Sequence, residues 1–318
     1  MTPLDVLVLS RAEVEALLDP GALLPALADG FRALSAGAVQ AADRTGLARP
    51  GEALLLSMPG HREGGPMAVK VVTVFEGNAR RGLASHLATI GLYDADTGAC
   101  LAFMDGTYIT AIRTSAAAAL ACDACARPQA RVLGIVGAGV QAEHHLATFP
   151  LVRDLDEIRV ASLRREDAER VAAADPRARA VASAREAAEG ADVVALTTYA
   201  GRPVVEPAWI APGAHVSSIG YRPPAGELPV ELARDGRLVV ETRLAFAPTP
   251  VGCGELQSLD PASAVELGEI LAGTTPGRRA ADEVTVYKAM GHVVEDLVAA
   301  RLVFDRARAE GVGRVVAL

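Results

Sequence analysis

Three cationic side chains stand in surroundings where a charge is uncommon. Lys70 interrupts the apolar run "MAVKVVTVF", Arg113 lies in the Ala-rich stretch "ITAIRTSA", and Arg44 lies in the turn-like stretch "AADRTGL". A lysine is seldom fully buried without a partner, and arginines bind carboxylates through paired hydrogen bonds. If the three converge, they form a site for a small carboxylate. Taken one by one, each is more typical of a surface cation whose stem lies along apolar groups.

A second group of residues has the spacing of a dinucleotide-binding turn. The stretch "RVLGIVGAGVQA" carries Gly137-x-Gly139-x-x-Ala142 between an apolar, strand-like run and a helical pattern. In such a turn the first glycine permits the bend, the second lets the backbone approach a diphosphate, and the small third residue allows close helix–strand packing. The diphosphate then lies at the helix N-terminus, where free N–H groups favour negative charge. We therefore expect a dinucleotide cofactor.

The kind of dinucleotide depends on the end of the next strand. There the chain reads "ASLRRED": Ser162 is followed by Arg164 and Arg165, and no acid stands at the strand end. NAD needs a carboxylate there for its ribose hydroxyl, whereas a guanidinium suits the 2′-phosphate of NADP. We expect NADP(H) to be preferred, with NAD(H) possible. The alternative is that both arginines are solvated helix-start residues and that Glu166 or Asp167 turns back.

Composition limits the class of protein. The chain has 318 residues, of which 51% are hydrophobic and 22% charged, which is typical of a globular protein with two domains. The net charge of -8, without a run of Lys or Arg, argues against partners such as nucleic acid or an anionic membrane. No uncharged apolar stretch is long enough to span a membrane, and the N-terminus lacks a signal-peptide pattern. We expect a cytoplasmic protein.

The four cysteines include a CxxC pair, Cys122 and Cys125, inside an Ala-rich helical run. A redox or metal site would need a strand-to-helix turn or a second pair of ligands. The sequence offers neither, so we expect small buried residues and no metal.

The pattern of apolar residues changes once along the chain. Residues 10–37 predict two helices, the first capped by Ser10 with Glu13, and residues 40–105 predict a mostly antiparallel sheet with a hairpin at "DADTG". Residues 107–127 predict a helix that stops before Pro128. From residue 131 strands alternate with helices, which indicates a parallel, doubly wound α/β sheet. Residues 282–311 read as one long amphipathic helix.

The order of three motifs resembles a known family. The blocks "DGTYITAIRTSAAAALA", "LGIVGAGVQAEHHL" and "TVYKAMGHVVEDLVAARLVFDRA" are similar to those of the ornithine cyclodeaminase/mu-crystallin family, from about residue 40 to the C-terminus. That family includes cyclodeaminases, an archaeal type of alanine dehydrogenase, and reductases of cyclic ketimines. The resemblance implies an α+β substrate-binding and dimerisation domain, residues 1–118 plus 290–318. A Rossmann-type domain, residues 119–289, is inserted in it, and the resemblance also implies a homodimer.

The resemblance also implies roles for single residues. Arg44, Lys70 and Arg113 would hold the substrate carboxylate, with Lys70 and Arg113 as catalytic residues and Lys70 acting also on the reacting nitrogen. The residues expected at the cofactor, from the resemblance and the motifs together, are Ser85, Arg113, Gly137, Gly139, Val140, Gln141, Ser162, Arg164, Arg165, Thr198, Ile219 and Lys288.

One departure from the family pattern bears on the reaction. Cyclodeaminases and alanine dehydrogenases of the family place an Asp, the general acid/base, just after the "IG" of a late strand. This chain has Tyr221 and Arg222 there, in "HVSSIGYRPPAGELP", which looks more like the ketimine reductase branch. Losing a positioned acid/base group costs roughly 10²–10⁴ in rate, although nearby Glu227 is a conceivable substitute. Reduction of a preformed cyclic imine asks for less than cyclodeamination.

We therefore expect an NADPH-dependent reductase of a small cyclic imine carboxylate, of the pyrroline- or piperideine-2-carboxylate type. Two alternatives stay open. One is an ornithine or lysine cyclodeaminase, or an alanine-type dehydrogenase, that uses NAD and acts on a free amino acid. The other is a non-catalytic protein that binds NADPH and a small ligand, as mu-crystallin does.

Overall fold

The computed structural model describes residues 4–49 and 53–318. The chain divides into two compact units, which are described separately. The first comprises the chain up to Arg113 together with His292–Leu318, and the second comprises Thr114–Gly291. Helix α3, Thr107–Cys125, contains the point at which the first unit ends and the second begins.

The first unit is built on a sheet of strand order β16-β1-β7-β6-β5-β4-β2, with β3 also paired to β4. All of its strand pairs are antiparallel except β1 with β7, which confirms the antiparallel sheet predicted for residues 40–105. The strands are β1 Asp5–Leu9, β2 Val39–Ala41, β3 Thr45–Arg49, β4 Ala53–Arg62, β5 Met67–Phe75, β6 His86–Tyr93, β7 Cys100–Asp105 and β16 Arg314–Ala317.

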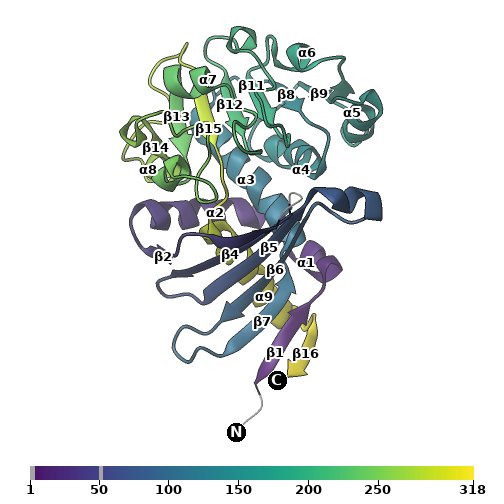
Figure 1. Ribbon diagram of the computed structural model, residues 1–318, viewed down its shortest axis with the longest axis vertical. Helices are drawn as coiled ribbons and strands as arrows, with labels where there is room; N and C mark the ends of the chain where they lie inside the picture. The colour runs from purple at the N-terminus through teal and green to yellow at the C-terminus, as the bar shows by residue number, and fades with distance from the viewer. Residues whose placement is uncertain (1–3, 50–52) are drawn as a thin grey trace. The chain divides into compact units, whose positions relative to one another are not determined.

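Three helices accompany this sheet: α1 Arg11–Leu17, α2 Pro20–Ser35 and α9 Val293–Glu310. Helix α1 begins with the predicted capping box, in which Ser10 and Glu13 bond each other's backbone N–H groups. Helix α9 lies against β4, β5 and β6 (Figure 1). Gly60 makes this close approach possible, because a Cβ there would lie 2.5 Å from Val293. Strand alternation turns Leu56, Met58 and Val72 toward α9, where they form an apolar core with Val293.

The second unit has an all-parallel sheet of order β10-β9-β8-β11-β12-β15-β13-β14. Because the first strands run 3-2-1-4-5 in chain order, this is the predicted Rossmann-type arrangement. Its strands are β8 Val132–Val136, β9 Glu157–Ala161, β10 Ala178–Ala180, β11 Val193–Leu196, β12 His215–Ser218, β13 Arg237–Val240, β14 Val265–Glu266 and β15 Thr285–Lys288. Its helices after α3 are α4 Val140–Thr148, α5 Arg165–Ala172, α6 Ala184–Ala188, α7 Val230–Asp235 and α8 Leu267–Leu271.

The prediction of one helix over residues 282–311 is wrong in its first part. Thr285–Lys288 forms strand β15, which is buried between β12 and β13. The helix starts only at Val293, after Gly291 has taken a left-handed conformation (φ 77°) and His292 has capped the first turn. Buried strand residues lack the polar alternation that marks a half-exposed strand, so periodicity alone joined them to the helix.

The prediction that the two CxxC cysteines are small buried residues is confirmed. Cys122 and Cys125 are buried free thiols on α3, and burial raises the pKa of each to about 12. Within residues 4–49 and 53–318, no group of three or more His, Cys, Asp or Glu residues is arranged so that it could bind a metal ion. Over the same residues, no helix combines the length and the apolar character that crossing a bilayer demands.

Candidate functional site

The first unit contains a buried cluster of two cations and two carboxylates. Lys70 Nζ donates to both carboxylate oxygens of Asp296, at 2.9 and 3.1 Å. Arg113 Nη1 donates to Glu295 Oε2 at 3.0 Å, and Arg113 Nε lies 3.3 Å from Asp296 Oδ1. No more than 5% of any of these side chains is exposed. The structure thus brings Lys70 and Arg113, two of the three predicted substrate ligands, onto one pair of acids.

The local folds that position these groups follow from the sequence. Along β5, alternation places Ala68, Lys70 and Val72 on the face that packs against α9. Glu295 and Asp296 stand in the first turn of α9, where the helix dipole favours negative charge. Glu295 also accepts the backbone N–H of His292 at 2.6 Å, so the residue that pairs with Arg113 closes the helix cap as well.

Burial makes Lys70 easier to deprotonate. It lowers the pKa of Lys70 from 10.5 to about 8; the charge of Asp296 opposes this shift and that of Arg113 adds to it. An ammonium with such a pKa can give up a proton near neutral pH. The arrangement therefore combines a fixed guanidinium, suited to a carboxylate, with a group able to donate a proton.

Arg44, the third predicted cation, acts on the same region. It is partly buried between β2 and β3. Together with burial, the charges of Arg44 and Arg113 lower the pKa of His292, the cap of α9, to about 4. Nearby, the pKa of His86 is lowered by burial and by the charge of Lys70, and the Ser85 hydroxyl lies 3.1 Å from His86 Nδ1. The charge of Arg44 thus acts on the cap of α9, and Ser85 contacts a histidine on which the charge of Lys70 acts.

Three residues of this cluster, Glu295, Asp296 and His292, are not among the site residues predicted from the sequence. The sequence "GHVVED" does contain a signal for them, because a histidine and two acids stand together at the start of an apolar helix. Buried cations require opposite charges, so this pair of acids was the natural place to look for the partners of Lys70 and Arg113.

The glycine turn of the second unit has the shape that a diphosphate requires. Gly137 adopts φ +125°, and a Cβ there would lie 2.5 Å from Thr197 Oγ1. Gly139 caps α4 without any side-chain hydrogen bond, and a Cβ at Gly139 would have nothing within 4 Å. In the first turn of α4, Val140 is exposed and Gln141 is half-buried, while Ala142 is buried against the sheet. These features fit a bound dinucleotide.

At the end of β9, the described structure has no carboxylate where NAD would need one. Ser162 is half-buried, and Arg164 and Arg165 are exposed. Arg164 pairs with Asp167 at 2.6 Å, and Arg165 pairs with Glu169 at 2.8 Å, along their own helix. The Asp167 carboxylate is therefore engaged by Arg164. Both arginines remain accessible to an added phosphate, because 75% and 66% of their side chains are exposed.

Two buried charges fix the backbone after β11 and β12. Glu227 accepts from the N–H and hydroxyl of Thr198, both at 2.6 Å, from the Gly220 N–H at 2.7 Å and from the Ser218 hydroxyl at 3.0 Å. Lys288 Nζ donates to the Gly220 carbonyl at 2.7 Å and to Ser218 Oγ at 3.1 Å, and it pairs with Glu255 at 2.6 Å. Gly220, which follows Ile219, is thus held through both its N–H and its carbonyl.

These contacts also show what stands at the position of the missing aspartate. The Tyr221 hydroxyl lies 2.9 Å from Thr249 Oγ1 and accepts the Gly254 N–H at 3.0 Å, which ties it to the loop that follows β13. Glu227, considered above as a substitute acid, has all four of its hydrogen bonds within the second unit and is fully buried. Neither side chain is arranged as a free acid/base group.

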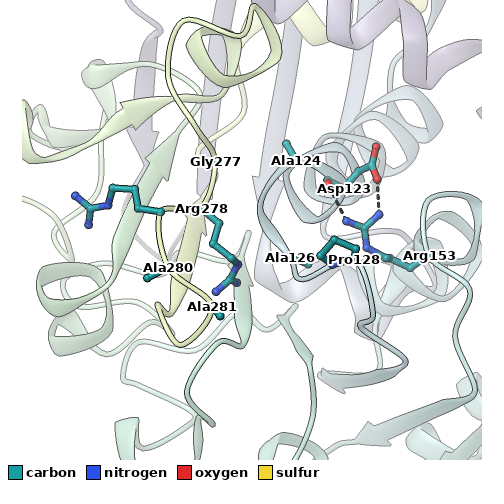
Figure 2. Close-up of a pocket in the computed structure, with 10 residues that line it drawn as sticks. Asp123, Ala124, Ala126, Pro128, Arg153, Gly277, Arg278, Ala280 and Ala281 are labelled. Atoms are coloured by element: carbon teal, nitrogen blue, oxygen red, sulfur yellow. Dashed lines mark hydrogen bonds and ion pairs between the residues drawn. The ribbon is translucent and has the colours of Figure 1, made fainter.

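A cavity of about 680 Å³ lies elsewhere in the second unit. Figure 2 shows Arg153 reaching Asp123 at its wall. Arg153 also donates to the Cys122 carbonyl at 3.2 Å, and Arg278 Nε to the Cys125 carbonyl at 2.9 Å. These arginines satisfy the last carbonyls of α3. The lining residues are Asp123, Ala124, Ala126, Pro128, Arg153, Gly277, Arg278, Arg279, Ala280 and Ala281, and none of them is a predicted site residue.

Comparison with known proteins identifies the family of the chain that carries this charge cluster and this glycine turn. Residues 5–311 match the model of the ornithine cyclodeaminase/mu-crystallin family. The chain belongs to this family. The ketimine reductase mu-crystallin of Mus musculus is 39% identical over 241 residues, which cover 75% of each protein.

Two solved structures of family members resemble the whole chain. Thermococcus litoralis Δ1-pyrroline-2-carboxylate reductase, in complex with NADH and L-proline, has a TM-score of 0.92 at 34% identity, over 98% of this chain and all of that one. An archaeal alanine dehydrogenase dimer with bound NAD has a TM-score of 0.89 at 28% identity, over 98% and 99%. These relatives are reductases and a dehydrogenase, and this family member is an oxidoreductase.

Proposed function

We propose that the protein is an NADPH-dependent reductase of a small cyclic imine carboxylate, of the pyrroline- or piperideine-2-carboxylate type. The observation that carries this proposal is the buried cluster of the first unit, in which Lys70 and Arg113 share Asp296. It offers a carboxylate ligand and a proton donor in one place. Similarity to a pyrroline-2-carboxylate reductase and to a ketimine reductase supports the same substrate class.

In this proposal each charged residue has one task. Arg44 and Arg113 bind the substrate carboxylate, and Arg113 is kept in position by Glu295. Lys70, oriented by Asp296, donates a proton to the ring nitrogen as the C=N bond is reduced to an amine. The nicotinamide supplies the hydride that the adjacent carbon accepts. No additional acid is required, which agrees with the engaged states of Tyr221 and Glu227.

The second unit would hold the cofactor. The diphosphate is assigned to the turn at Gly137 and Gly139, and the nicotinamide to the backbone near Thr198 and Ile219. Glu227 and Lys288 act here as positioning residues, because Glu227 accepts the Gly220 N–H and Lys288 donates to the Gly220 carbonyl. Lys288 is fully buried with three partners, so we assign its influence to the backbone at Gly220.

The preference for NADP(H) rests on Arg164 and Arg165. Both are exposed at the end of β9, where no carboxylate stands to accept from a ribose hydroxyl. Relatives solved with NADH or NAD favour the opposite choice. The double variant R164A/R165A distinguishes the two: we expect its KM for NADPH to rise at least tenfold while its KM for NADH changes little. Equal KM values for NADPH and NADH in the unaltered protein would contradict the preference.

The substrate class is tested by a matrix of two cofactors and two kinds of substrate. NADPH or NADH is mixed with pyrroline-2-carboxylate and piperideine-2-carboxylate, and loss of absorbance at the nicotinamide band is followed. In the reverse direction, NADP+ or NAD+ is mixed with ornithine, lysine or alanine, and ammonia is measured. We expect NADPH oxidation with at least one of the two imines. No oxidation above buffer with either ring would refute the proposal.

A second candidate function is an NAD-dependent amino-acid dehydrogenase, favoured by the similarity to the archaeal alanine dehydrogenase with NAD. Ammonia release from alanine together with reduction of NAD+ would establish it, whereas ammonia release from ornithine or lysine without net reduction would indicate a cyclodeaminase. The engaged states of Tyr221 and of Glu227, the carboxylate after β12, argue against the dehydrogenase, because neither side chain is arranged as a free general base. Ligand-dependent thermal stabilisation without turnover would instead indicate a binding protein, the remaining alternative.

We also propose that the first unit forms a homodimer through the sheet face opposite to α9. Leu47, Leu55 and Leu87 lie in one row across β3, β4, β5 and β6, and 75%, 40% and 37% of these residues is exposed. Phe103 and Val8 continue the apolar face on β7 and β1. Such a continuous apolar face is typical of a protein interface. One structural relative is a dimer.

A further inference from the structure

His292 occupies the junction between the charge cluster and helix α9. Its Nδ1 accepts the Val294 N–H at 3.1 Å, and its own backbone N–H donates to Glu295 Oε1 at 2.6 Å. A neutral imidazole has one nitrogen that donates and one that accepts. Since Nδ1 accepts, the ring proton is on Nε2. The cap of the helix thus fixes the tautomer and leaves Nε2–H as a donor.

The surroundings of the ring keep it neutral. Burial, Arg44 and Arg113 hold the pKa of His292 at about 4, while Asp296 acts in the opposite direction. A protonated ring would place another cation near Arg44 and Arg113, close to the imine nitrogen that becomes positively charged when Lys70 protonates it. A neutral N–H donor adds a hydrogen bond without adding charge.

The Nε2 atom of His292 also differs from those of two fully buried histidines, His145 and His215. The Nε2 atoms of His145 and His215 are enclosed in the second unit without a hydrogen-bond partner. His292 Nε2 is not among the enclosed, unpartnered atoms of the described residues, and the residue retains 9% exposure. The donor is therefore accessible from solvent at the place where Arg44 and Arg113 act.

We infer that His292 is a further substrate-binding residue, whose Nε2–H donates to an oxygen of the carboxylate that Arg44 and Arg113 bind. The inference rests on the proposed function and adds one neutral donor to its carboxylate site. A hydrogen bond to a charged group contributes roughly 10- to 100-fold in affinity. His292 is thus expected to affect substrate binding much more than the proton or hydride transfer.

The test must separate this donor from the helix cap. Asparagine is a good N-cap residue, so His292→Asn keeps an acceptor for the Val294 N–H but has no donor at the Nε2 position. Glutamine is long enough to return an N–H donor there. For the two variants and the unaltered protein, KM and kcat are measured with the imine at saturating NADPH, the dissociation constant of L-proline by calorimetry, and the melting temperature by scanning calorimetry.

We expect His292→Asn to raise KM and the L-proline dissociation constant at least tenfold, with kcat changed less than threefold and the melting temperature retained. His292→Gln should recover most of the binding. If the unaltered protein reduces the imine and His292→Asn binds as well as it does, His292 is only a cap and the inference fails alone. If the unaltered protein neither turns over the imines nor binds L-proline, the proposed function fails, and the inference fails with it.

Discussion

At the scale of single residues, the proposed imine reduction depends on the protonation state of one buried lysine. Lys70 has a pKa of about 8, so it carries its proton below that pH and loses it above. If Lys70 supplies the proton for imine reduction, only the protonated form is active. Activity must then decline on the alkaline side, and the pH of that decline should respond to charges near Lys70.

For the unaltered protein we predict that kcat/KM falls about tenfold per pH unit above pH 8, because kcat/KM reports the pKa values of the free enzyme. Lys70→Arg keeps the positive charge but cannot release a proton in this range, and it should lose roughly 10²- to 10⁴-fold in kcat. The measurement is a pH series at saturating NADPH. An identical alkaline fall in the residual activity of Lys70→Arg would assign the fall to the substrate.

Asp296 provides the complementary test. The Asp296 carboxylate raises the pKa of Lys70 through its charge and its hydrogen bonds. The charge of Glu295 raises it as well, as a smaller effect. Asp296→Asn should therefore move the alkaline fall of kcat/KM to lower pH. Asp305→Asn is the matched control, since Asp305 is exposed on the same helix and pairs with Arg301 at 2.6 Å. A shift of equal size in both variants would contradict the assigned role of Asp296.

How much of the site the sequence reveals follows from the chemistry of each residue. Lys70 and Arg113 were found because a cation in an apolar run is conspicuous. Glu295 and Asp296 were missed because acids at the start of a helix have an ordinary explanation, the helix dipole. Only the fold shows that this helix start packs against β5, 226 residues away from it in the sequence.

At the scale of elements, local signals predicted what local interactions determine. The capped helix α1, the β6–β7 hairpin and the alternation from β8 onward are confirmed. Strand β15 was assigned to the following helix because its identity depends on pairing with β12 and β13, which are distant in the chain. The short strands β1 and β16, which pair with each other near the chain ends, were likewise not anticipated.

The glycine turn yields a prediction for an element. Gly139→Ala places its Cβ in open space at the start of α4, where the backbone has an ordinary negative φ of -91°. The fold should tolerate the change, with an unaltered melting temperature, whereas cofactor binding should weaken at least tenfold because the methyl group occupies the approach of the diphosphate. The measurement is titration of nicotinamide fluorescence. Gly65→Ala, in the first unit, is the control: a Cβ there would meet only the Arg62 carbonyl oxygen, at 3.4 Å, so this variant should fold and bind cofactor normally. Unchanged cofactor affinity in Gly139→Ala would contradict the assigned cradle.

At the scale of the whole molecule, the proposed function assigns separate tasks to the two compact units. The first unit carries the charge cluster and the open apolar face, and the second carries the dinucleotide turn and the fixed backbone near Ile219. Such a division predicts that the open face can be altered without affecting the cofactor site.

Leu55→Lys tests the proposed dimer. It adds a charge to the open face at the centre of the row of leucines, so we expect a shift from dimer to monomer in sedimentation, with NADPH affinity retained. Leu151→Lys is a matched control, because Leu151 is also exposed but belongs to the second unit and is not one of the predicted cofactor residues. Dimers of equal stability in both variants would show that this face is not the interface.

The most direct test of the central claim is the fate of the transferred hydrogen. The protein is incubated with pyrroline-2-carboxylate or piperideine-2-carboxylate and NADPH that carries deuterium on the transferred position of its nicotinamide, and the product is analysed by mass spectrometry and NMR. From at least one of the two imines we predict the corresponding product, proline or pipecolate, with one deuterium on the carbon that bears the carboxylate. A product without that deuterium, or no product from either imine, would contradict the proposed reduction.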